Sequence, residues 1–347
     1  MSTKTTYKQT ELGLIPDDWE VKKLGEVIKL GNGKDYKHLN SGNIPVYGTG
    51  GIITYVDKYL FNGKSVGIGR KGSIDKPVLL DGKFWTVDTL FYVKEFFNSD
   101  IDFIYNSFLK IPWLKYNEAT GLPSLSQNII NNLKIPLPPL PEQKKIADCL
   151  STWDVAIEKQ NALINALTDR KKALMQQLLT GKKRLPGFSD EWKEVKLGEI
   201  CEIKKGSQIN KIELSSNLGF PVINGGIEPS GYHDDWNVAE NTITISEGGN
   251  SCGFINFIKE KFWSGGHCYT LQNLKININK IFLFYFLKNS ENQIMKLRVG
   301  SGLPNIQQKD IKNFEILLPK IEEQTAIAEI LATADRELQL QKEKLAQ

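Results

Sequence analysis

GLPSLSQNIINNLKIPLPPLPEQKKIADCLSTWD, residues 121–154, occurs a second time in this chain as GLPNIQQKDIKNFEILLPKIEEQTAIAEILATAD, residues 302–335. The two stretches align without gaps at an offset of 181 (302 minus 121), and sixteen of their 34 positions are identical. A second pair of blocks, 18–26 and 191–199, matches at an offset of 173 and shares a tryptophan and the tripeptide Leu-Gly-Glu. Because the blocks follow one another in the same order, the chain is an internal duplication.

The composition is that of a folded protein with two cores. A chain of 347 residues is long for one domain, and 40% hydrophobic with 24% charged residues excludes disordered and fibrous classes. No stretch approaches the ~18 apolar residues that span a bilayer, and the polar N-terminus is not followed by an apolar signal region, so we expect a soluble, intracellular protein. Four scattered cysteines suit a reducing compartment, and a net charge of +4 permits nucleic acid as a partner.

Between the matching blocks the two halves diverge in sequence. Short apolar runs such as 44–47, 65–68 and 242–245, bounded by turn residues, predict strands. The tracts 98–117 and 279–297 have apolar residues at mixed helical spacing. Each middle is therefore predicted to be an α+β domain.

The segment after residue 141 has a different period. Apolar residues alternate in steps of four and three, which is the spacing of a coiled-coil seam, and Glu142-Gln143 and Gly181 mark a helix expected over 142–180. The same register continues in the second copy. The seam positions are Ile146, Leu150, Trp153, Ile157, Ile164, Leu167, Leu174, Leu178, Ile327, Leu331, Leu338 and Leu345.

These patterns divide the chain into four predicted parts. They are a first globular domain over 1–141, a central helix over 142–185, a second globular domain over 186–320 and a shorter helix over 321–347. Since one chain carries two long seams, we expect the helices to pair with each other as an antiparallel coiled coil, which gives a pseudo-twofold molecule.

The second helix is shorter than the first. Residue 347 corresponds to residue 166, so residues 167–180 have no counterpart. We expect the unmatched Leu167, Leu174 and Leu178 to pack elsewhere, against N-terminal residues, a partner subunit or a second copy.

Several motifs that could indicate an enzyme fail on context. Residues 67–72 match GxGxxG, but a strand-like run follows them and no helix would hold a phosphate. Residues 62–65 resemble the end of a phosphate-binding loop, but Lys58 stands where that loop has its first glycine, and the second half has no match. Glu20 and Lys22 could belong to a nuclease metal site, but such a site needs a carboxylate from a separate strand, and none is expected here. Cys252, His267 and Cys268 lack the spacing of zinc ligands, and three histidines form no convincing catalytic arrangement. No catalytic residue, metal or cofactor is predicted.

Five sets of residues carry a resemblance to a known family. They are Gly13-x-Ile15-Pro16-x-x-Trp19 with Leu24-Gly25-Glu26, Pro186-Gly187-Phe188 with Trp192 and Leu197-Gly198-Glu199, the two Gly-Leu-Pro tripeptides, Ile135-Pro136-Leu137-Pro138-Pro139 with Glu142-Gln143, and Leu174-Met175-Gln176-Gln177-Leu178-Leu179-Thr180-Gly181-Lys182. Together they resemble the DNA-specificity (S) subunit of type I restriction-modification systems. The resemblance covers nearly the whole chain.

The resemblance implies two target-recognition domains that alternate with helical regions, and no catalytic activity in this chain. Separate modification subunits, expected to number two, methylate adenine with S-adenosylmethionine, and restriction subunits cleave with ATP. Those cofactors would therefore be bound by the partners. The short second helix departs from the family pattern, in which the C-terminal helix carries its own Leu-Leu-Thr-Gly-Lys-like ending.

Two similar but non-identical domains suit a bipartite, asymmetric target in double-stranded DNA, with half-sites about one helical turn, ~34 Å, apart. Base reading needs polar donors and acceptors on loops. Residues of this kind on Gly-bounded loops are Lys34, Tyr36, Lys37, Arg70, Lys71, Ser73, Lys204, Lys205, Ser207, Gln208, Asn224, Asn250 and Arg298.

Two other functions stay open at this point. One is a free-standing DNA-binding regulator or antagonist on the same scaffold, which tight autonomous operator binding would favour. The other is a nuclease or metal enzyme that uses the Glu20 or Cys252 region, which metal-dependent cleavage by the isolated chain would favour.

Overall fold

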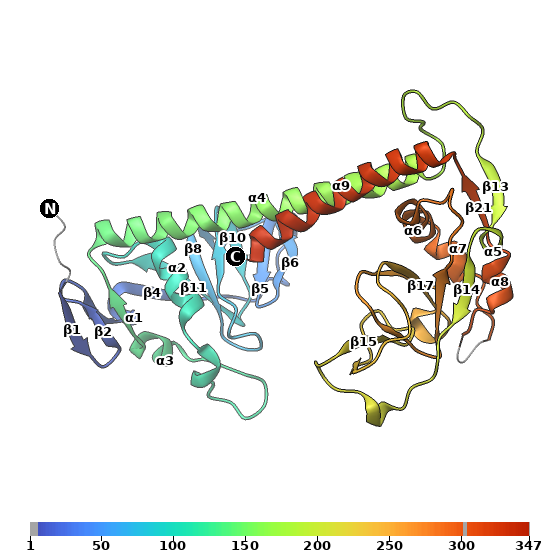
Figure 1. The fold of residues 1–347 in the computed structure, drawn as a ribbon. Helices are drawn as coiled ribbons and strands as arrows, with labels where there is room; N and C mark the ends of the chain where they lie inside the picture. Colours follow the sequence, from blue (N-terminus) through green and yellow to red (C-terminus); the bar gives the residue numbers. More distant parts are fainter. Residues whose placement is uncertain (1–5, 301–303, 347) are drawn as a thin grey trace. The chain divides into compact units, whose positions relative to one another are not determined.

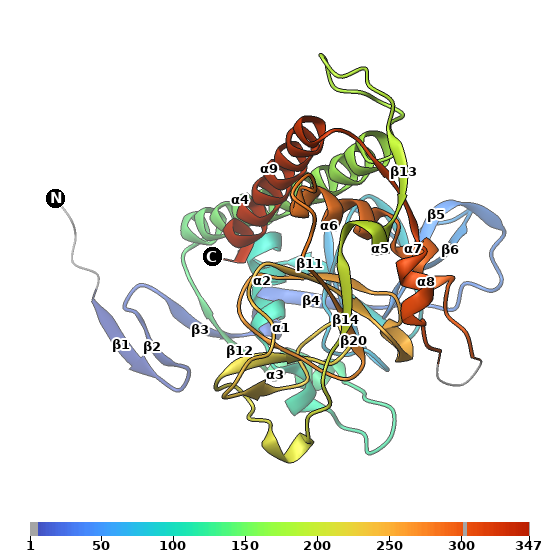
Figure 2. The ribbon, with the colours of Figure 1, turned by 45° about the vertical axis from the view of Figure 1, so that its right-hand side comes forward.

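The computed structural model describes residues 6–300 and 304–346 and divides into two units, unit 1 over 1–156 and unit 2 over 157–347 (Figure 1, Figure 2). Each unit has its own buried apolar core. Two residues of the second Gly-Leu-Pro tripeptide, Gly302 and Leu303, lie outside the described residues. Within the described ranges, no helix is both long enough and apolar enough to cross a membrane.

Unit 1 is built on two four-stranded sheets, in the orders β4-β11-β8-β9 and β6-β5-β10-β7, with two further strand pairs, β1-β2 and β3-β12. In the first sheet β11 pairs antiparallel with both of its neighbours. The strands are β1 (Tyr7–Thr10), β2 (Gly13–Pro16), β3 (Glu20–Lys23), β4 (Ile28–Asn32), β5 (Ser41–Gly48), β6 (Gly51–Val56), β7 (Phe61–Asn62), β8 (Ser65–Gly69), β9 (Val78–Leu80), β10 (Lys83–Thr86), β11 (Leu90–Phe96) and β12 (Lys134–Leu137).

Helices complete the core of unit 1. They are α1 (Leu24–Val27), α2 (Ile101–Lys110), η1 (Trp113–Tyr116), α3 (Gln127–Asn132) and the long α4 (Leu140–Leu178). In α2, Phe103 and Ile104 are buried in one cluster with Ile68 of β8 and Ala147 of α4. The carboxylate of Asp100 caps α2, because it accepts hydrogen bonds from the first free backbone N–H groups. The helix is thereby fixed between the sheet and the start of α4.

Unit 2 repeats this plan with a four-stranded sheet β14-β20-β17-β18, a three-stranded sheet β16-β15-β19 and the pair β13-β21. The strands are β13 (Lys193–Lys196), β14 (Glu202–Lys205), β15 (Phe220–Ile223), β16 (Tyr232–His233), β17 (Thr242–Ser246), β18 (Ile255–Ile258), β19 (Trp263–Ser264), β20 (Cys268–Gln272) and β21 (Glu315–Leu318). The helices are α5 (Leu197–Ile200), η2 (Lys211–Glu213), η3 (Gly249–Ser251), α6 (Lys280–Asn289), α7 (Glu291–Met295), α8 (Gln308–Lys312) and α9 (Ile321–Ala346).

The repeated tryptophan and glutamate of the two sequence blocks meet in space. In unit 1 the indole N–H of Trp19 donates to the carboxylate of Glu142 at 3.2 Å, and in unit 2 that of Trp192 donates to Glu323 at 3.1 Å. In unit 2 the guanidinium of Arg184 adds two hydrogen bonds to Glu323, at 2.7 and 2.8 Å. Each contact joins the entry strand of a unit to the start of its long helix.

The repeated glutamine next to this glutamate is buried in both units and makes matching bonds. The amide of Gln143 accepts from the backbone N–H of Asp100 at 2.8 Å and donates to the carbonyl of Pro138 at 2.8 Å. Gln324 bonds to Asn279 and Pro319 with the same two distances. We call these Trp-Glu and Gln contacts, with the pairs β3-β12 and β13-β21, the shared frame.

The expected α+β fold with an internal repeat is confirmed. The predicted runs 44–47, 65–68 and 242–245 lie in β5, β8 and β17. The two tracts with mixed helical spacing contain α2 and η1 in unit 1, and α6 and α7 in unit 2.

Within unit 2, α9 pairs antiparallel with the second half of α4. The amide of Gln160 donates to Gln341 at 2.9 Å, and further along α4 Lys171 forms an ion pair with Asp335. The partner numbers fall along α9 as the numbers rise along α4, which defines the antiparallel direction. The expected pairing of the two seams within one chain is therefore present in unit 2.

The unmatched end of the central helix is covered within unit 2. Leu178 lies in the main apolar core with Ile327 and Leu331 of α9, and Leu174 packs against that core. The expectation that these leucines pack against N-terminal residues, a partner or a second copy is therefore wrong for Leu174 and Leu178. An antiparallel pair brings the end of the first helix to the start of the second, where the globular domain also contributes side chains.

Other seam positions are less covered. The exposed fraction is 39% for Leu150, 66% for Trp153 and 47% for Ile157, whereas Leu338 is 9% exposed. Ile164, Leu167 and Leu345 are half-buried. The apolar seam of α4 thus includes residues, Leu150, Trp153 and Ile157, whose side chains are exposed to solvent.

Candidate nucleic-acid interface

The predicted reading residues of unit 1 lie on two loops. Lys34, Tyr36 and Lys37 follow β4, and Arg70, Lys71 and Ser73 follow β8. The first loop is anchored because the indole N–H of Trp85 in β10 donates to the carbonyl of Lys34 at 2.8 Å. Tyr36 packs against a small apolar cluster instead of standing free in solvent.

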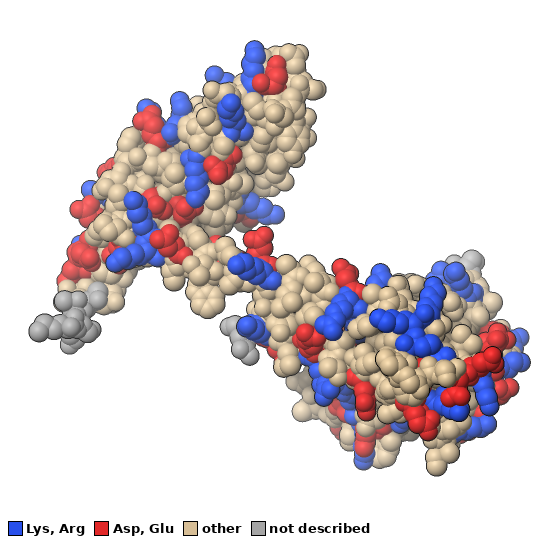
Figure 3. All heavy atoms as spheres, turned by 90° about the horizontal axis from the view of Figure 1, so that it is seen from above, with Lys and Arg blue, Asp and Glu red and all other residues tan. Residues whose placement is uncertain are grey.

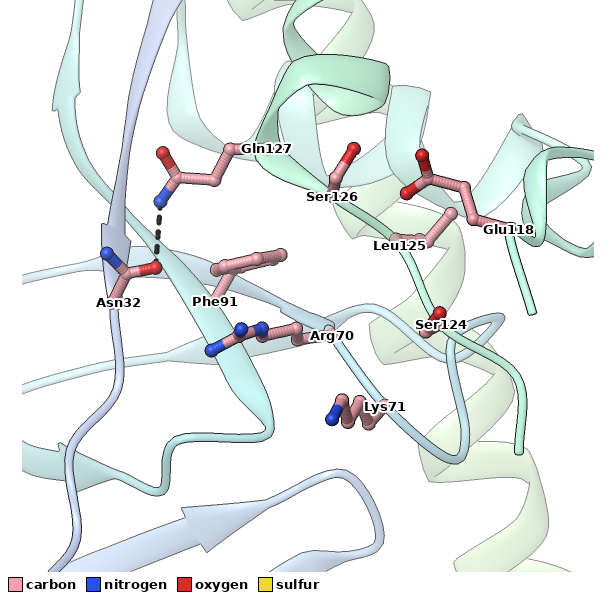
Figure 4. Close-up of a pocket in the computed structure, with 9 residues that line it drawn as sticks. All are labelled: Asn32, Arg70, Lys71, Phe91, Glu118, Ser124, Leu125, Ser126 and Gln127. Atoms are coloured by element: carbon pink, nitrogen blue, oxygen red, sulfur yellow. Dashed lines mark hydrogen bonds between the residues drawn. The ribbon is translucent and has the colours of Figure 1, made fainter. Parts of the chain in front are cut away.

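Arg70 and Lys71 line a polar pocket of about 430 Å³ at the ends of β4 and β8 (Figure 4). Asn32, Phe91 and Gln127, which were not predicted as site residues, line the same pocket. They come from three separate segments of the chain. Gln127 is one of the repeated identities of the 121–154 block, so the repeat pointed to this position without revealing its role.

Local contacts orient the polar groups of this pocket. Arg70 extends beneath the Phe91 ring toward Asn32, with its guanidinium carbon 5.9 Å from the ring centroid (Figure 4). The amide of Gln127 donates to the side-chain carbonyl of Asn32 at 3.0 Å, which uses the acceptor of Asn32 and not its N–H donors. The pocket therefore presents cationic and amide donors, the groups that read acceptors on base edges.

The predicted reading residues of unit 2 are spread over five segments. Lys204 and Lys205 end β14, Ser207 and Gln208 follow them, Asn224 follows β15, Asn250 lies in η3, and Arg298 follows α7. The side chain of Asn224 has a local role, since its carbonyl accepts from the backbone N–H of His267 at 3.1 Å. Asn250 and Arg298 are exposed.

Lys205 is paired with a buried carboxylate that was not predicted from the sequence. Glu247, which follows β17, is 3% exposed, and its Oε1 accepts from Lys205 Nζ at 2.5 Å and from the Tyr269 hydroxyl at 2.9 Å. Burial acts to raise the pKa of Glu247, but the hydrogen bonds from Lys205 and Tyr269 outweigh it and hold that pKa below its ordinary value.

The other oxygen of Glu247 has a different environment. Oε2 is buried without a hydrogen-bond partner among the described residues, and Nδ1 of the exposed His267 lies 3.5 Å away. Burial and the neighbouring carboxylate raise the pKa of Tyr269, so its hydroxyl remains a donor at neutral pH. The cluster holds Lys205 at the surface, with its side chain 50% exposed.

The residues considered for a metal or nuclease site have local partners. Glu20 forms a surface ion pair with Lys22 at 3.1 Å. Cys252 and Cys268 are buried, and burial raises the pKa of Cys268 to about 11, so it stays a thiol at neutral pH. Over residues 6–300 and 304–346, no group of three His, Cys, Asp or Glu side chains is placed to hold a metal ion.

Charge on the surface is mixed. On the face shown in Figure 3, Lys and Arg side chains are intermingled with Asp and Glu over each unit. On this face, an attraction for nucleic acid would therefore be local and would not come from one continuous basic surface.

Comparison with known proteins gives a consistent result. Residues 16–169 and 189–347 each match the family model described as "Type I restriction modification DNA specificity domain". A specificity subunit of the type I restriction enzyme MjaVIII from Methanocaldococcus jannaschii is 27% identical, over 96% of this chain and 90% of that protein. A putative type I specificity subunit of Mycoplasma pneumoniae is 34% identical over 42% of this chain and 40% of its own length.

Solved structures share the fold. The S subunit of a type I restriction-modification system from M. genitalium has a TM-score of 0.72 at 19% identity, covering 94% of this chain and 92% of that one. The HsdS subunit from Thermoanaerobacter tengcongensis has a TM-score of 0.52 at 20% identity, covering 95% and 92%.

Proposed function

Because the chain belongs to the type I restriction-modification DNA-specificity family, we propose that it reads a bipartite, asymmetric target in double-stranded DNA, one half-site with each unit. The observation that carries this proposal is that the two units have the same shared frame but different polar groups at the ends of their matching strands. The Trp-Glu and Gln contacts recur with nearly equal distances, while the pocket of unit 1 and the Lys205 cluster of unit 2 differ in chemistry.

Different reading surfaces on equivalent domains have a direct consequence for the target. A homodimer with identical reading surfaces requires a palindrome, whereas two unlike domains on one chain can bind two unlike sequences. The donors and acceptors for this reading would come from those of the thirteen predicted residues that face solvent. Tyr36 packs against an apolar cluster and the Asn224 carbonyl is used locally, and Lys204 and Lys205 lie in β14 and not on a loop. Arg70, Lys71 and Lys205 are the strongest candidates. Arg70 and Lys71 line the polar pocket of unit 1, and an ion pair with Glu247 holds Lys205 at the surface of unit 2.

The long helices would set the distance between half-sites and carry the modification subunits. A rigid pair of helices acts as a spacer, and half-sites about one helical turn, ~34 Å, apart fit two domains that approach the same side of the duplex. In this assembly two modification subunits bind S-adenosylmethionine, and restriction subunits that join the complex use ATP. The chain itself would hold neither cofactor and catalyse no reaction, acting in the cytoplasm of a prokaryotic cell.

Reconstitution with type I modification subunits from the same organism tests this function. DNA methylated by the complex is mapped by long-read sequencing, with the complex lacking this chain as the control. We expect one bipartite motif with unlike halves, and no motif without the chain. Equal methylation in both samples would contradict the proposal. Tight sequence-specific binding by the chain alone, with no dependence of methylation on it, would instead indicate a free-standing regulator.

A further inference from the structure

Arg70 of unit 1 and Glu247 of unit 2 occupy the same place in the shared fold. Each is the first residue after the matching strand, β8 or β17. The carbonyl of Arg70 accepts from the backbone N–H of Leu125 at 2.9 Å, and that of Glu247 accepts from Ile306 at 2.8 Å. Leu125 and Ile306 are aligned positions of the repeat, so the two backbones are held in the same way.

The next two strands of each sheet, β11 and β4 in unit 1 and β20 and β14 in unit 2, supply further equivalent positions. On β11 of unit 1, Phe91 is opposite Asn32, and on β20 of unit 2, Tyr269 is opposite Lys205. Asn32 and Lys205 therefore end the matching strands β4 and β14. The neighbour of Arg70 is a neutral amide, whereas the neighbour of Glu247 is a cation.

The charge at these positions is inverted between the units. In unit 1 the cation stands on the β8 end, exposed and next to Phe91. In unit 2 that place holds a buried carboxylate, and the cation comes from the β14 end. A buried carboxylate is costly unless it is paired, and here Lys205 and the Tyr269 hydroxyl pair it. The cationic donor thus follows β8 in unit 1, whereas in unit 2 it comes from the end of β14, the strand that matches β4.

We infer that the neighbouring strand ends described above, β8 and β4 in unit 1 and β17 and β14 in unit 2, determine the base specificity of each unit. Arg70 donates to the acceptor edge of a guanine in one half-site, and Lys205 donates in the other. Glu247 is a positioning residue that fixes the ammonium group of Lys205. The inference rests on the proposed function, because it assumes that the units read DNA.

The chemistry of the two cations supports this assignment. Arg and Lys side chains pair with O6 and N7 of guanine in the major groove, which is the commonest base-specific contact. A long cationic side chain that is free in solvent loses conformational entropy when it binds, and both cations here are already restrained. Phe91 restrains Arg70, and the Glu247 carboxylate restrains Lys205.

The test uses the full complex with its modification subunits and compares motifs by long-read methylation mapping. Arg70→Ala is expected to reduce discrimination at one base of one half-site by roughly 5- to 150-fold, the range of a good base contact, and to leave the other half-site unchanged. The double variant Lys205→Ala with Glu247→Gln is expected to do the same in the other half-site only. The second substitution avoids an unpaired buried carboxylate.

Matched controls remove exposed lysines at other places in each unit. Lys110→Ala, at the end of α2, serves unit 1, and Lys259→Ala, after β18, serves unit 2. Both variants are expected to methylate the same motif as the parent complex.

Glu247→Gln alone separates positioning from mere stability. It keeps an acceptor for the Tyr269 hydroxyl but removes the charge that fixes Lys205. We expect relaxed reading in one half-site together with tighter binding to unrelated DNA, since a negative charge is lost. A purely structural role would lower specific and non-specific binding together and would contradict the positioning role.

A graft keeps the inference testable if a loss variant fails to assemble. Asn32→Lys, Arg70→Glu and Phe91→Tyr together give unit 1 the chemistry of unit 2, and changed preference at one base of its half-site is expected. If assembled variants keep the parental motif in both halves, the inference is overturned while the proposed function stands. If the parent complex itself shows no bipartite motif, the proposed function fails first.

Discussion

Units 1 and 2 share the contacts of the frame and differ in the residues that follow β8 and β17. The bonds of Gln143 and Gln324 have the same lengths, yet the places of Arg70 and Glu247 carry opposite charges. The duplicated units thus share the contacts of the frame and differ at the ends of these two strands. The difference teaches that fold and specificity are carried by separate sets of residues.

The largest expected effect comes from one difference inside the frame itself. Glu323 is 2% exposed and holds both Arg184 and Trp192, whereas the bond to Glu142 comes from Trp19. Glu323→Ala removes one carboxylate that accepts three hydrogen bonds, two from Arg184 and one from Trp192, and is expected to give the largest loss of stability in urea unfolding.

The matched variant in unit 1 is Glu142→Ala, which removes the acceptor of the Trp19 indole N–H. We expect it to lower the free energy of unfolding by about 1 kcal/mol. Equal losses for Glu142→Ala and Glu323→Ala would show that the Arg184 contact adds nothing to the frame of unit 2.

Gln143→Ala and Gln324→Ala test the similar part of the comparison. Each substitution leaves a backbone N–H and a backbone carbonyl without their partner, so each is expected to destabilise its own unit by about 2–3 kcal/mol. Urea unfolding followed by hydrogen exchange assigns the loss to a unit. A large loss for one variant and none for the other would break the equivalence of the frame.

A smaller contrast lies along the coiled-coil seam. Leu338→Ala removes a side chain that is 9% exposed and is expected to cost about 2 kcal/mol, near the low end for a buried leucine. Leu150→Ala, at 39% exposure, is expected to cost less than about 1 kcal/mol. Thermal unfolding of the two variants measures the difference, and a reversed order would show that the exposed seam of α4 is covered in solution.

The smallest effect is the pH dependence that Glu247 gives to unit 2. The pKa of Glu247 in the folded protein lies below its ordinary value of 4.5, so its contribution to stability is present above pH 4.5 and is lost as the pH falls through the lowered pKa. The matching place in unit 1 holds Arg70 and no carboxylate. Glu247→Gln should flatten this acid dependence for unit 2, and an unchanged acid profile would contradict the role of the charge.

The repeat and the helical period predicted most of the fold. The alternating spacing of apolar residues predicted a helix over 142–180, and α4 runs from Leu140 to Leu178. The repeated Trp, Glu and Gln were visible in the sequence, because residues that hold a frame are the ones two copies share. The antiparallel direction was predicted, but aligning the two copies residue by residue left Leu178 without a counterpart. In an antiparallel pair Leu178 lies in one core with Ile327 and Leu331, near the start of α9.

The candidate site was only partly predictable. Loop position and residue type pointed to Arg70, Lys71 and Lys205, but not to their neighbours. Asn32, Phe91 and Gln127 come from separate segments that strand pairing brings together, and strand register cannot be read from short strands alone. Glu247 follows a run of buried residues and gives no local signal, because its meaning depends on Lys205 across the sheet.

A graft of one unit's middle into the other tests the central claim most directly. Residues 28–133 replace residues 201–314, and the junctions are matched, since Leu24 bonds to Leu133 at 2.8 Å where Leu197 bonds to Phe314 at 2.9 Å. If each unit reads its own half-site, the methylated motif of the reconstituted complex becomes a palindrome built from the half-site of unit 1. An assembled complex that still methylates an asymmetric motif would contradict the account.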